Sequence, residues 1–184
     1  MQVVFERGYC GASVRDIVNA AGAPQGSFTN HFVSKDAFCL ELLDRYFAMV
    51  EENIRLTLRN DAASPLDRLE QWLDIQIGFL KKAGMRNGCL IGNFSAEAGE
   101  HSEPIRRRLG EIYREIHRSV AYCLEAAVKA GELHSSADCD ELAHFLYAAL
   151  HGAILQSKVE HSPVPFERFK KTLFAFVLRP ADPR

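Results

Sequence analysis

Five neighbouring residues between positions 25 and 30 combine small size with hydrogen-bonding capacity. They are Gln25, Gly26, Ser27, Thr29 and Asn30. Amide and hydroxyl groups form hydrogen bonds with the edges of DNA bases in the major groove, and a glycine lets the two backbones approach closely. The chemistry that this segment indicates is therefore non-covalent recognition of double-stranded DNA.

Two short predicted helices position these residues. Ser13 is a suitable N-cap for the first helix, and Gly22 ends it because a left-handed residue is least strained as glycine. The second helix is predicted from about Pro24 to Phe32, with Phe28 and Phe32 one turn apart on its inner side. Two short helices joined by a tight turn form a helix-turn-helix, whose second helix enters the major groove.

The remainder of the chain also predicts helices. Apolar residues recur every three or four positions, strand-like alternation is nearly absent, and the prolines divide the helical patterns instead of interrupting them. Glycines at positions 84, 88, 92 and 99 predict a break in helical structure around residues 89–94. The predicted fold class is all-α, with a short helix-turn-helix domain followed by a larger antiparallel helical domain.

The composition is that of an ordinary globular protein. The 184 residues carry 22 Lys and Arg against 24 Asp and Glu, a net charge of −2, and 47% of them are hydrophobic. These values exclude a disordered chain and a generally basic nucleic-acid coat protein. The longest stretch without formal charge, Leu142 to Ser157, is shorter than the roughly 20 residues of a membrane span. Glu6 and Arg7 leave no apolar signal-peptide core, so we expect a cytoplasmic protein without a membrane partner.

The sequence contains no pattern of catalytic or metal-binding residues. It lacks a nucleophile elbow, an HExxH motif, a phosphate-binding glycine loop and paired catalytic carboxylates. The five cysteines form no CxxC pair, and His144 and His151 are seven residues apart, which suits a pocket or an interface better than a metal site. We therefore predict no enzyme, no cofactor and no metal.

A longer pattern surrounds the helix-turn-helix. Residues 8–38 read GY, two further residues, and then ASVRDIVNAAGAPQGSFTNHFVSKDAF. This composite spacing resembles the tetracycline-repressor (TetR) family of bacterial transcriptional regulators. The resemblance implies a DNA-binding domain at residues 1–47 and an all-α ligand-binding and dimerisation domain at residues 48–184. It also implies a homodimeric repressor that a small molecule releases from operator DNA.

The same resemblance assigns DNA contacts to individual side chains. The predicted DNA-binding residues are Ser13, Arg15, Gln25, Ser27, Thr29, Asn30 and Lys35. Gln25 and Ser27 fall on base-reading positions, and Lys35 falls on a phosphate contact at the start of the next helix. Thr29 stands where the family usually has a phosphate-binding tyrosine, and Gln25 where it commonly has a lysine. Both departures predict weaker contacts with the DNA.

The amino-terminal segment of the motif is short in this chain. Against the family pattern we expect most of the usual first helix to be missing and the inner faces of Ile17, Phe28 and Phe38 to be partly uncovered. Each uncovered side chain loses part of the stabilisation of about 1.5–3 kcal/mol that full burial of a large apolar side chain provides. Residues 1–35 also carry only three basic side chains against two acidic ones. Because non-specific affinity rests on phosphate neutralisation, a monomer should bind DNA weakly and depend on dimerisation.

We predict that the last two helices form the homodimer interface. Ala149, Gly152 and Ala153 make a patch of small residues that permits close helix approach, and larger apolar residues flank it. The predicted interface residues are Ala149, Gly152, Ala153, Phe169, Leu173 and Phe176. A bundle of four such helices from two chains would hold the recognition helices about 34–36 Å apart, the spacing of successive major grooves.

A group of mainly aromatic side chains has the composition of a small-molecule pocket. Its predicted members are Trp72, Phe79, Cys89, Phe94, Tyr113, His117, Tyr122 and Phe145. The stretches GCLIGNFSAE, SEPIRRRL and AVKAGEL resemble one branch of carboxy-terminal domains in the family, and some members of that branch respond to reactive electrophiles. We therefore expect a small apolar or electrophilic effector.

Cys89 has two interpretations. The plainer one is an unreactive, half-buried thiol, the usual state of a free cysteine. The other is a redox or electrophile sensor, because Arg86, Lys81 and Lys82 lie close in the sequence and nearby cations lower the pKa of a thiol.

Two alternatives lack DNA binding. In one, residues 13–32 are only a packed helical hairpin, but exposed amide and hydroxyl groups beside Gly26 are poor choices for packing alone. In the other, the chain is a helical protein that senses a small molecule or an electrophile and has lost DNA binding. A gel shift with DNA upstream of the chain's own gene separates this alternative from a regulator.

Overall fold

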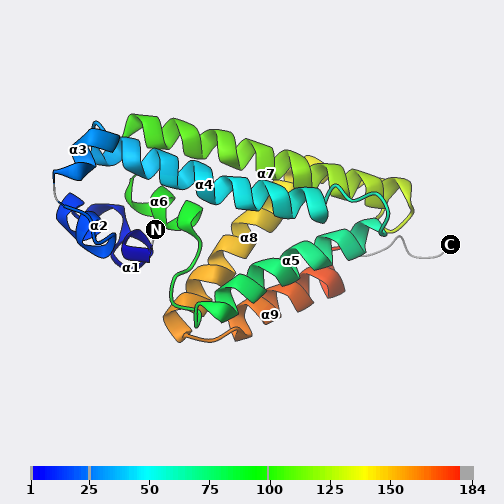
Figure 1. The fold of residues 1–184 in the computed structure, drawn as a ribbon. Helices are drawn as coiled ribbons and strands as arrows, with labels where there is room; N and C mark the ends of the chain where they lie inside the picture. The colour runs from blue at the N-terminus through cyan, green and yellow to red at the C-terminus, as the bar shows by residue number, and fades with distance from the viewer. Residues whose placement is uncertain (1, 25, 99, 179–184) are drawn as a thin grey trace. The chain divides into compact units, whose positions relative to one another are not determined.

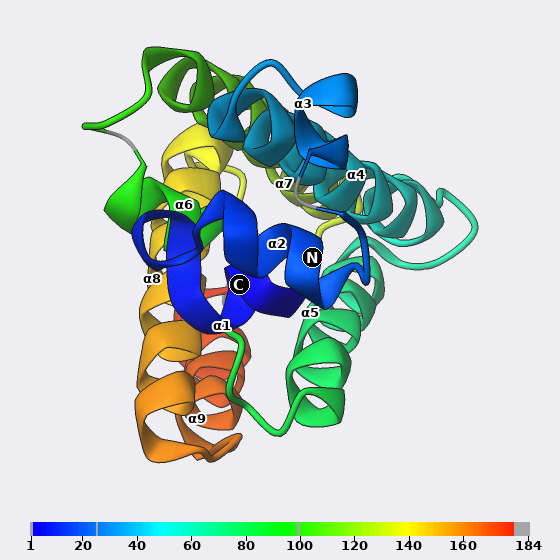
Figure 2. The ribbon, with the colours of Figure 1, turned by 60° about the vertical axis from the view of Figure 1, so that its left-hand side comes forward.

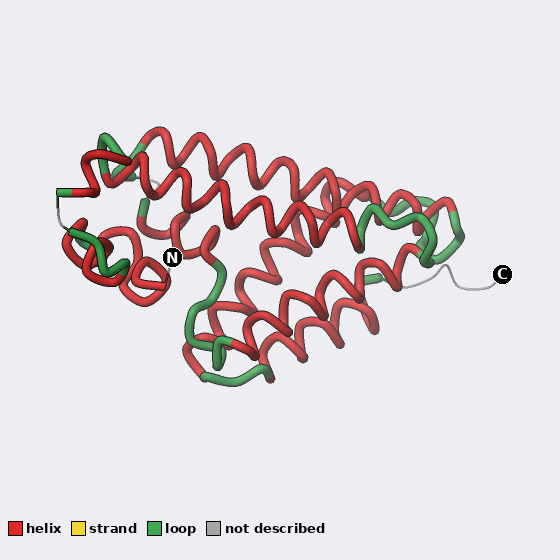
Figure 3. Tube along the Cα trace, in the orientation of Figure 1, coloured by secondary structure: helices red, strands yellow, loops and turns green. Residues whose placement is uncertain are grey.

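The structure is a computed structural model that describes residues 2–24, 26–98 and 100–178, and the regular elements in these ranges are helical (Figure 1, Figure 3). The helices are α1 (Gln2–Gly11), α2 (Val14–Ala20), α3 (Ser27–His31), α4 (Lys35–Leu56), α5 (Pro65–Lys82), α6 (Leu90–Glu97), α7 (Glu103–Lys129), α8 (Cys139–Glu160) and α9 (Val164–Thr172), with a closing π-helical turn η1 (Leu173–Val177). The all-α prediction is confirmed. Among these helices, none is both long and apolar enough to cross a membrane.

Local sequence signals explain where several helices begin. Ser13 caps α2: its hydroxyl accepts a hydrogen bond from the Asp16 backbone N–H at 3.1 Å, and the Asp16 carboxylate accepts one from the Ser13 N–H at 3.0 Å. Ser64 caps α5 immediately before Pro65, and Asp138 caps α8. Each cap satisfies N–H groups that the first turn of a helix leaves without an intrahelical partner.

Two elements differ from the sequence prediction. α3 begins at Ser27, later than expected, because the Ser27 N–H and hydroxyl both donate to the Pro24 carbonyl and make a turn there. α6 occupies the region where the glycines predicted a break. Its residues Leu90 and Phe94 are fully buried, and this burial outweighs the low helix propensity of Gly92.

Contacts within the chain divide it into two units. The amino-terminal unit comprises residues 1–49 and 87–112, and the carboxy-terminal unit comprises residues 50–86 and 113–184. The division falls inside α4 and α7, so each of these helices contributes to both units. The sequence predicts a boundary between residues 47 and 48, where the DNA-binding domain ends and the ligand-binding domain begins. That boundary separates two functions and is not defined by contacts, so it stays a prediction.

The core of the amino-terminal unit includes α1, which packs against α2 and α6 (Figure 2). Val4 and Tyr9 of α1 are buried. Phe28 is also buried, which corrects the expectation that it would be partly uncovered. The rings of Phe32 and Phe38 lie 5.4 and 5.8 Å from its ring, centroid to centroid, and they cover it.

Ile17 and Phe38 are half-buried, in agreement with the prediction. Together with α1 residues and the end of α2 they line an open cavity of about 490 Å³. Its apolar lining residues are Val3, Val4, Ile17, Ala20, Ala21 and Phe38.

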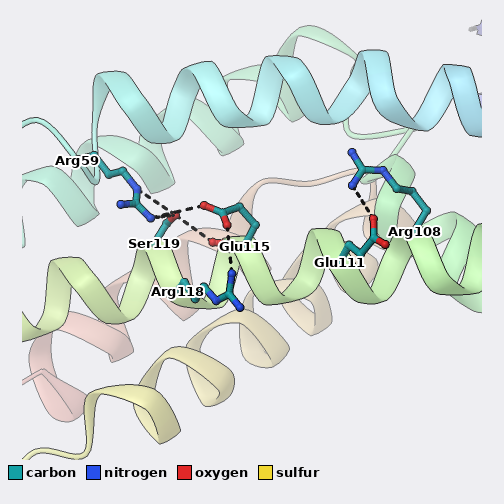
Figure 4. A network of polar contacts seen from close by, with 6 residues as sticks. All are labelled: Arg59, Arg108, Glu111, Glu115, Arg118 and Ser119. Atoms are coloured by element: carbon teal, nitrogen blue, oxygen red, sulfur yellow. Dashed lines mark hydrogen bonds and ion pairs between the residues drawn. The ribbon is translucent and has the colours of Figure 1, made fainter.

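In the carboxy-terminal unit, α8 and α9 lie side by side (Figure 1, Figure 2). Trp72 and Phe166 are among the largest fully buried side chains. Polar contacts join the segment after α4 to α7: the Arg59 guanidinium donates to the Ser119 hydroxyl at 3.2 Å and pairs with Glu115 at 3.5 Å (Figure 4). These contacts fix the α4–α5 connection against α7.

Candidate nucleic-acid interface and effector region

The turn between α2 and α3 has the backbone that the sequence predicts. Gly22 follows the end of α2 with a positive φ of 63°, a conformation that costs a residue with a side chain about 1–2 kcal/mol. The Ala23 N–H donates to the Val18 carbonyl at 3.0 Å and closes the turn. α3 then packs on α2 with Phe28 facing inward, so the opposite side of α3 is left for solvent.

The outer face of α3 carries three of the predicted DNA-binding side chains. Thr29 and Asn30 are exposed, and Ser27 is half-buried. The Ser27 hydroxyl donates to the Pro24 carbonyl at 2.7 Å. The Thr29 hydroxyl donates to the Gly26 carbonyl at 3.1 Å. Both hydroxyls therefore use their proton within the chain and keep lone pairs to accept a hydrogen bond. The Asn30 amide offers both donors and an acceptor. Gln25 lies outside the described residues.

Ser13 and Arg15, at the start of α2, are both exposed. The Ser13 hydroxyl donates to the Asp16 carboxylate at 2.6 Å, and Arg7 of α1 pairs with the same carboxylate at 2.6 Å. The hydrogen bonds from Ser13, with a smaller contribution from Arg7, lower the pKa of Asp16. An ionised Asp16 therefore ties α1 to the first motif helix, and Arg15 is left beside it on the surface.

Lys35, the predicted phosphate contact, lies on an aromatic ring that the sequence analysis did not single out. Its Nζ is 4.8 Å from the centroid of the Tyr9 ring, a cation–π distance. The Tyr9 hydroxyl donates to Asp36 Oδ1 at 2.7 Å. Burial and this hydrogen bond raise the pKa of Tyr9. The pattern at residues 8–38 contains both Tyr9 and Asp36, but they are 27 positions apart and only the fold brings them together.

Cys89 is the N-cap residue of α6 and is half-buried. The Tyr46 hydroxyl of α4 donates to its sulfur at 3.6 Å. Burial raises the pKa of the Cys89 thiol, and the N–H groups of Gly92 and Ile91 with the Tyr46 hydroxyl oppose this rise only in part. A lowering of the thiol pKa by neighbouring basic residues, on which the sensor interpretation of Cys89 depends, is therefore not found, because desolvation dominates; the pKa agrees with the plainer interpretation of an unreactive thiol.

The predicted pocket residues divide between the two units. Cys89 and Phe94 belong to the amino-terminal unit, and the others to the carboxy-terminal unit. Three of the latter lie at the surface in this chain: Phe79, Tyr122 and Phe145 are 53%, 38% and 54% exposed. Tyr122 donates to the Asp61 carboxylate at 3.1 Å. An enclosed pocket that includes these three side chains finds no support within a single chain.

Two of the predicted pocket residues, Tyr113 and His117, form an aromatic cluster with two further histidines, His144 and His151. The His117 and His144 rings lie 3.9 Å apart, and the Tyr113 ring is 6.1 Å from His117 and 6.2 Å from His151. Burial lowers the pKa of His117, and it lowers that of His151 to about 4, so both imidazoles are neutral at pH 7. Trp72 is fully buried and meets this cluster through the Tyr147 ring, which lies 6.5 Å from Trp72 and 4.6 Å from His151. The Trp72 indole N–H has no hydrogen-bond partner among the described residues.

The predicted dimer interface residues gather on one groove of α8, α9 and η1. Five of the six, Ala149, Gly152, Ala153, Phe169 and Leu173, line a cavity of about 330 Å³, and Phe145 lines it with them. Phe176, the sixth predicted interface residue, is 65% exposed in the single chain, and Leu155 and Val159 of α8 are exposed as well. The structure therefore brings five of the six predicted residues together at one largely apolar groove, in which Ala153 and Leu173 are already buried within the single chain.

The geometry defines a class of protein. Two short helices meet at a glycine turn, the second presents small polar side chains to solvent, and a helical unit carries an apolar groove on its last helices. These are the parts of a helix-turn-helix DNA-binding protein joined to a helical regulatory unit.

Comparison with known proteins agrees with this class. The family described as bacterial regulatory proteins, tetR family, matches residues 1–42, and the tetracyclin repressor-like C-terminal domain matches residues 65–173. The HTH-type transcriptional repressor DhaR of Mycobacterium sp. strain GP1 is 36% identical over 177 residues, 96% of this chain and 87% of the relative. The repressor NemR of Escherichia coli K12 is 29% identical over 169 residues, 90% and 83% of the two chains.

Solved structures agree as well. The regulatory protein TetR from Rhodobacter sphaeroides has a TM-score of 0.89 and 30% identity, covering 94% of this chain and 92% of that one. The reduced form of E. coli NemR has a TM-score of 0.86 and 27% identity, covering 99% and 93%. The chain belongs to the TetR family of transcriptional regulators, which are not enzymes. The alternative without DNA binding is not favoured, because the match to residues 1–42 covers the helix-turn-helix.

Proposed function

We propose that this chain represses transcription by binding operator DNA as a homodimer, and that a small molecule releases it. Ligand-responsive repression is the typical mode of the family, and proteins of this family bind operator DNA as dimers. The observation that carries the proposal is the exposed polar face of α3 beside Lys35. The direct test is binding to DNA upstream of the chain's own gene, with and without candidate effectors.

Individual side chains have distinct proposed roles at the DNA. Arg15, Ser27 and Asn30 would contact base edges, together with Gln25, because their amide, hydroxyl and guanidinium groups match the donors and acceptors of the major groove. Lys35 would neutralise a phosphate, which carries no sequence information. Ser13 would meet the backbone at the start of α2, and Thr29 would make a shorter contact than a tyrosine.

Replacement of Lys35 tests the division between base and phosphate contacts. Lys35→Ala should weaken binding to specific and unrelated DNA alike and reduce the salt dependence by about one unit of slope, the loss of one neutralised phosphate. The measurement is binding at several salt concentrations. Lys82→Ala, which removes an exposed lysine from α5, is the control and should change neither quantity. An unchanged slope in Lys35→Ala would refute the phosphate contact.

The proposed homodimer forms through α8 and α9. The apolar groove of about 330 Å³ contains small residues where helices of two chains would cross. The side chains of Phe145, Leu155 and Phe176, which are exposed in the single chain, would be buried in the same dimer interface. Burial of apolar surface is the main source of affinity in stable dimers.

The proposed effector is small and largely apolar, with an electrophile as the second route. Within the carboxy-terminal unit Trp72 is buried, the lowered pKa values of His117 and His151 keep these two imidazoles uncharged at pH 7, and the Trp72 N–H offers one donor to a bound ligand. This environment favours an uncharged ligand with a hydrogen-bond acceptor. The electrophile route would use the Cys89 thiol at the start of α6, where burial raises the thiol pKa and so works against the reactive thiolate. One relative has a structure described as a reduced form.

Replacement of Cys89 separates the two routes. A quinone would react by addition: the Cys89 sulfur forms a bond to a ring carbon, and the thiol proton passes to the reduced ring. Cys89→Ser should abolish release from DNA by a quinone and leave release by neutral aromatic compounds intact. The readout is operator affinity before and after each compound, with Cys139→Ser as the matched control. Quinone-driven release that persists in Cys89→Ser would exclude this thiol as the sensor.

A further inference from the structure

A carboxylate at the end of α6 holds the kinked end of α1. The backbone N–H of Cys10 donates to Glu97 Oε2 at 3.0 Å. Gly8 has a φ of 72° and breaks the regular course of α1 at this point. A Cβ atom at Gly8 would overlap both carboxylate oxygens of Glu97. The absence of a side chain at position 8 therefore allows the carboxylate to lie against the backbone of α1.

The position of Glu97 needs an explanation in its own right. It is the last residue of α6, where the helix dipole disfavours a negative charge. A further carboxylate also opposes DNA binding by simple electrostatics. The hydrogen bond from Cys10 offsets the first cost, because a charged acceptor makes the stronger kind of hydrogen bond. The rings of Tyr9 and Phe94, 6.1 Å apart, add a second contact between α1 and α6.

The residue between Gly8 and Cys10 connects this contact to the DNA-binding surface. Tyr9 lies under the Lys35 ammonium at 4.8 Å and donates to Asp36 at 2.7 Å. Lys35 and Asp36 form the first turn of α4, which follows the recognition helix α3 in the sequence. A shift of the end of α1 would therefore move the ring on which Lys35 rests.

We propose that Glu97 is a positioning residue for DNA binding: its carboxylate fixes the end of α1, and Tyr9 thereby holds Lys35 at its phosphate contact. The inference rests on the proposed function, because it concerns how the same DNA-binding surface is held. It makes α6 part of the DNA-binding apparatus and not only of the regulatory region.

Three substitutions separate positioning from charge. Glu97→Gln removes the charge and keeps an oxygen that can accept from Cys10, so it should bind DNA within about twofold of the parent. Glu97→Ala removes the acceptor. Glu97→Asp keeps the charge but shortens the side chain by one methylene, so the carboxylate no longer reaches the Cys10 N–H. Both should weaken binding about two- to tenfold, the range of one net hydrogen bond. If Glu97 acts only through its charge, Glu97→Gln and Glu97→Ala should both bind DNA more tightly than the parent, and Glu97→Asp should bind like the parent. That order of affinities would overturn the proposal.

A double-mutant cycle tests the path through Lys35. In a Lys35→Ala background, Glu97→Ala should weaken binding less than twofold further, because both changes remove the same phosphate contact. Fully additive losses would overturn the proposal. Hydrogen exchange of the Cys10 amide supplies a readout without DNA: it should be faster in Glu97→Ala and Glu97→Asp and near the parent rate in Glu97→Gln. A parent protein that fails to bind the upstream DNA would refute the proposed function instead, and the exchange result would still decide whether Glu97 fixes α1.

Discussion

Gly152→Trp is expected to convert the protein to a monomer and to weaken operator binding by a factor of about 100 or more, the scale on which linked binding sites exceed single ones. Gly152 is exposed on α8 and lines the apolar groove. Apart from the helix's own neighbouring backbone, no atom lies within 4 Å of a Cβ built at this position, so a side chain can leave the backbone there without a clash in the single chain. A second chain packed against the small-residue patch cannot accommodate an indole.

The matched control for this substitution is Gly78→Trp. Gly78 lies on α5, and a Cβ built there is equally free of neighbours within 4 Å. Sedimentation at a fixed protein concentration measures the oligomeric state, and a gel shift measures DNA binding. We expect Gly78→Trp to remain a dimer that binds DNA. A dimeric Gly152→Trp protein would place the interface elsewhere, and a monomeric parent would refute the homodimer.

Phe28→Ala should lower the free energy of unfolding by roughly 3–5 kcal/mol, the usual cost of removing a buried phenylalanine ring. Phe28 is 6% exposed, and the rings of Phe32 and Phe38 both contact it. α3 is only five residues long, so tertiary packing rather than intrinsic propensity keeps it helical. Loss of this ring should therefore unfold the recognition helix before the rest of the protein and abolish DNA binding.

Val33→Ala provides the comparison. Val33 is 96% exposed, and such surface changes usually alter stability by less than about 0.5 kcal/mol. Urea unfolding at one fixed protein concentration measures both variants, because dimer stability depends on concentration. A loss below about 1 kcal/mol in Phe28→Ala would mean that the aromatic cluster does not hold α3 in place.

Signals within a few residues of one another predicted much of this structure. The cap at Ser13, the turn at Gly22 and the inward ring of Phe28 are local features, and the structure contains all three. The break predicted near Gly92 was wrong, because glycine propensity is a weak effect beside the burial of a whole helix face. Periodicity gave the helices but not the full extent of each buried face, so Phe79 appeared as a pocket residue although it is exposed.

Contacts between residues distant in the sequence could not be predicted. Cys10 and Glu97 are 87 positions apart, and Tyr9 and Asp36 are 27 apart. No local pattern marks either pair. The raised pKa of Cys89 has the same origin: the sequence displays neighbouring charges, whereas the desolvation that outweighs them arises only from the fold.

The central claim is that the exposed face of α3 reads a DNA sequence, and competition between two DNA fragments tests it most directly. One labelled fragment contains the DNA upstream of the chain's own gene, and the other is a scrambled fragment of the same length and composition. Fluorescence anisotropy at physiological salt measures both affinities. We expect a preference of about 1,000-fold or more for the upstream DNA, at the lower end of the range for specific DNA-binding proteins. Equal affinity for the two fragments would contradict sequence recognition by α3.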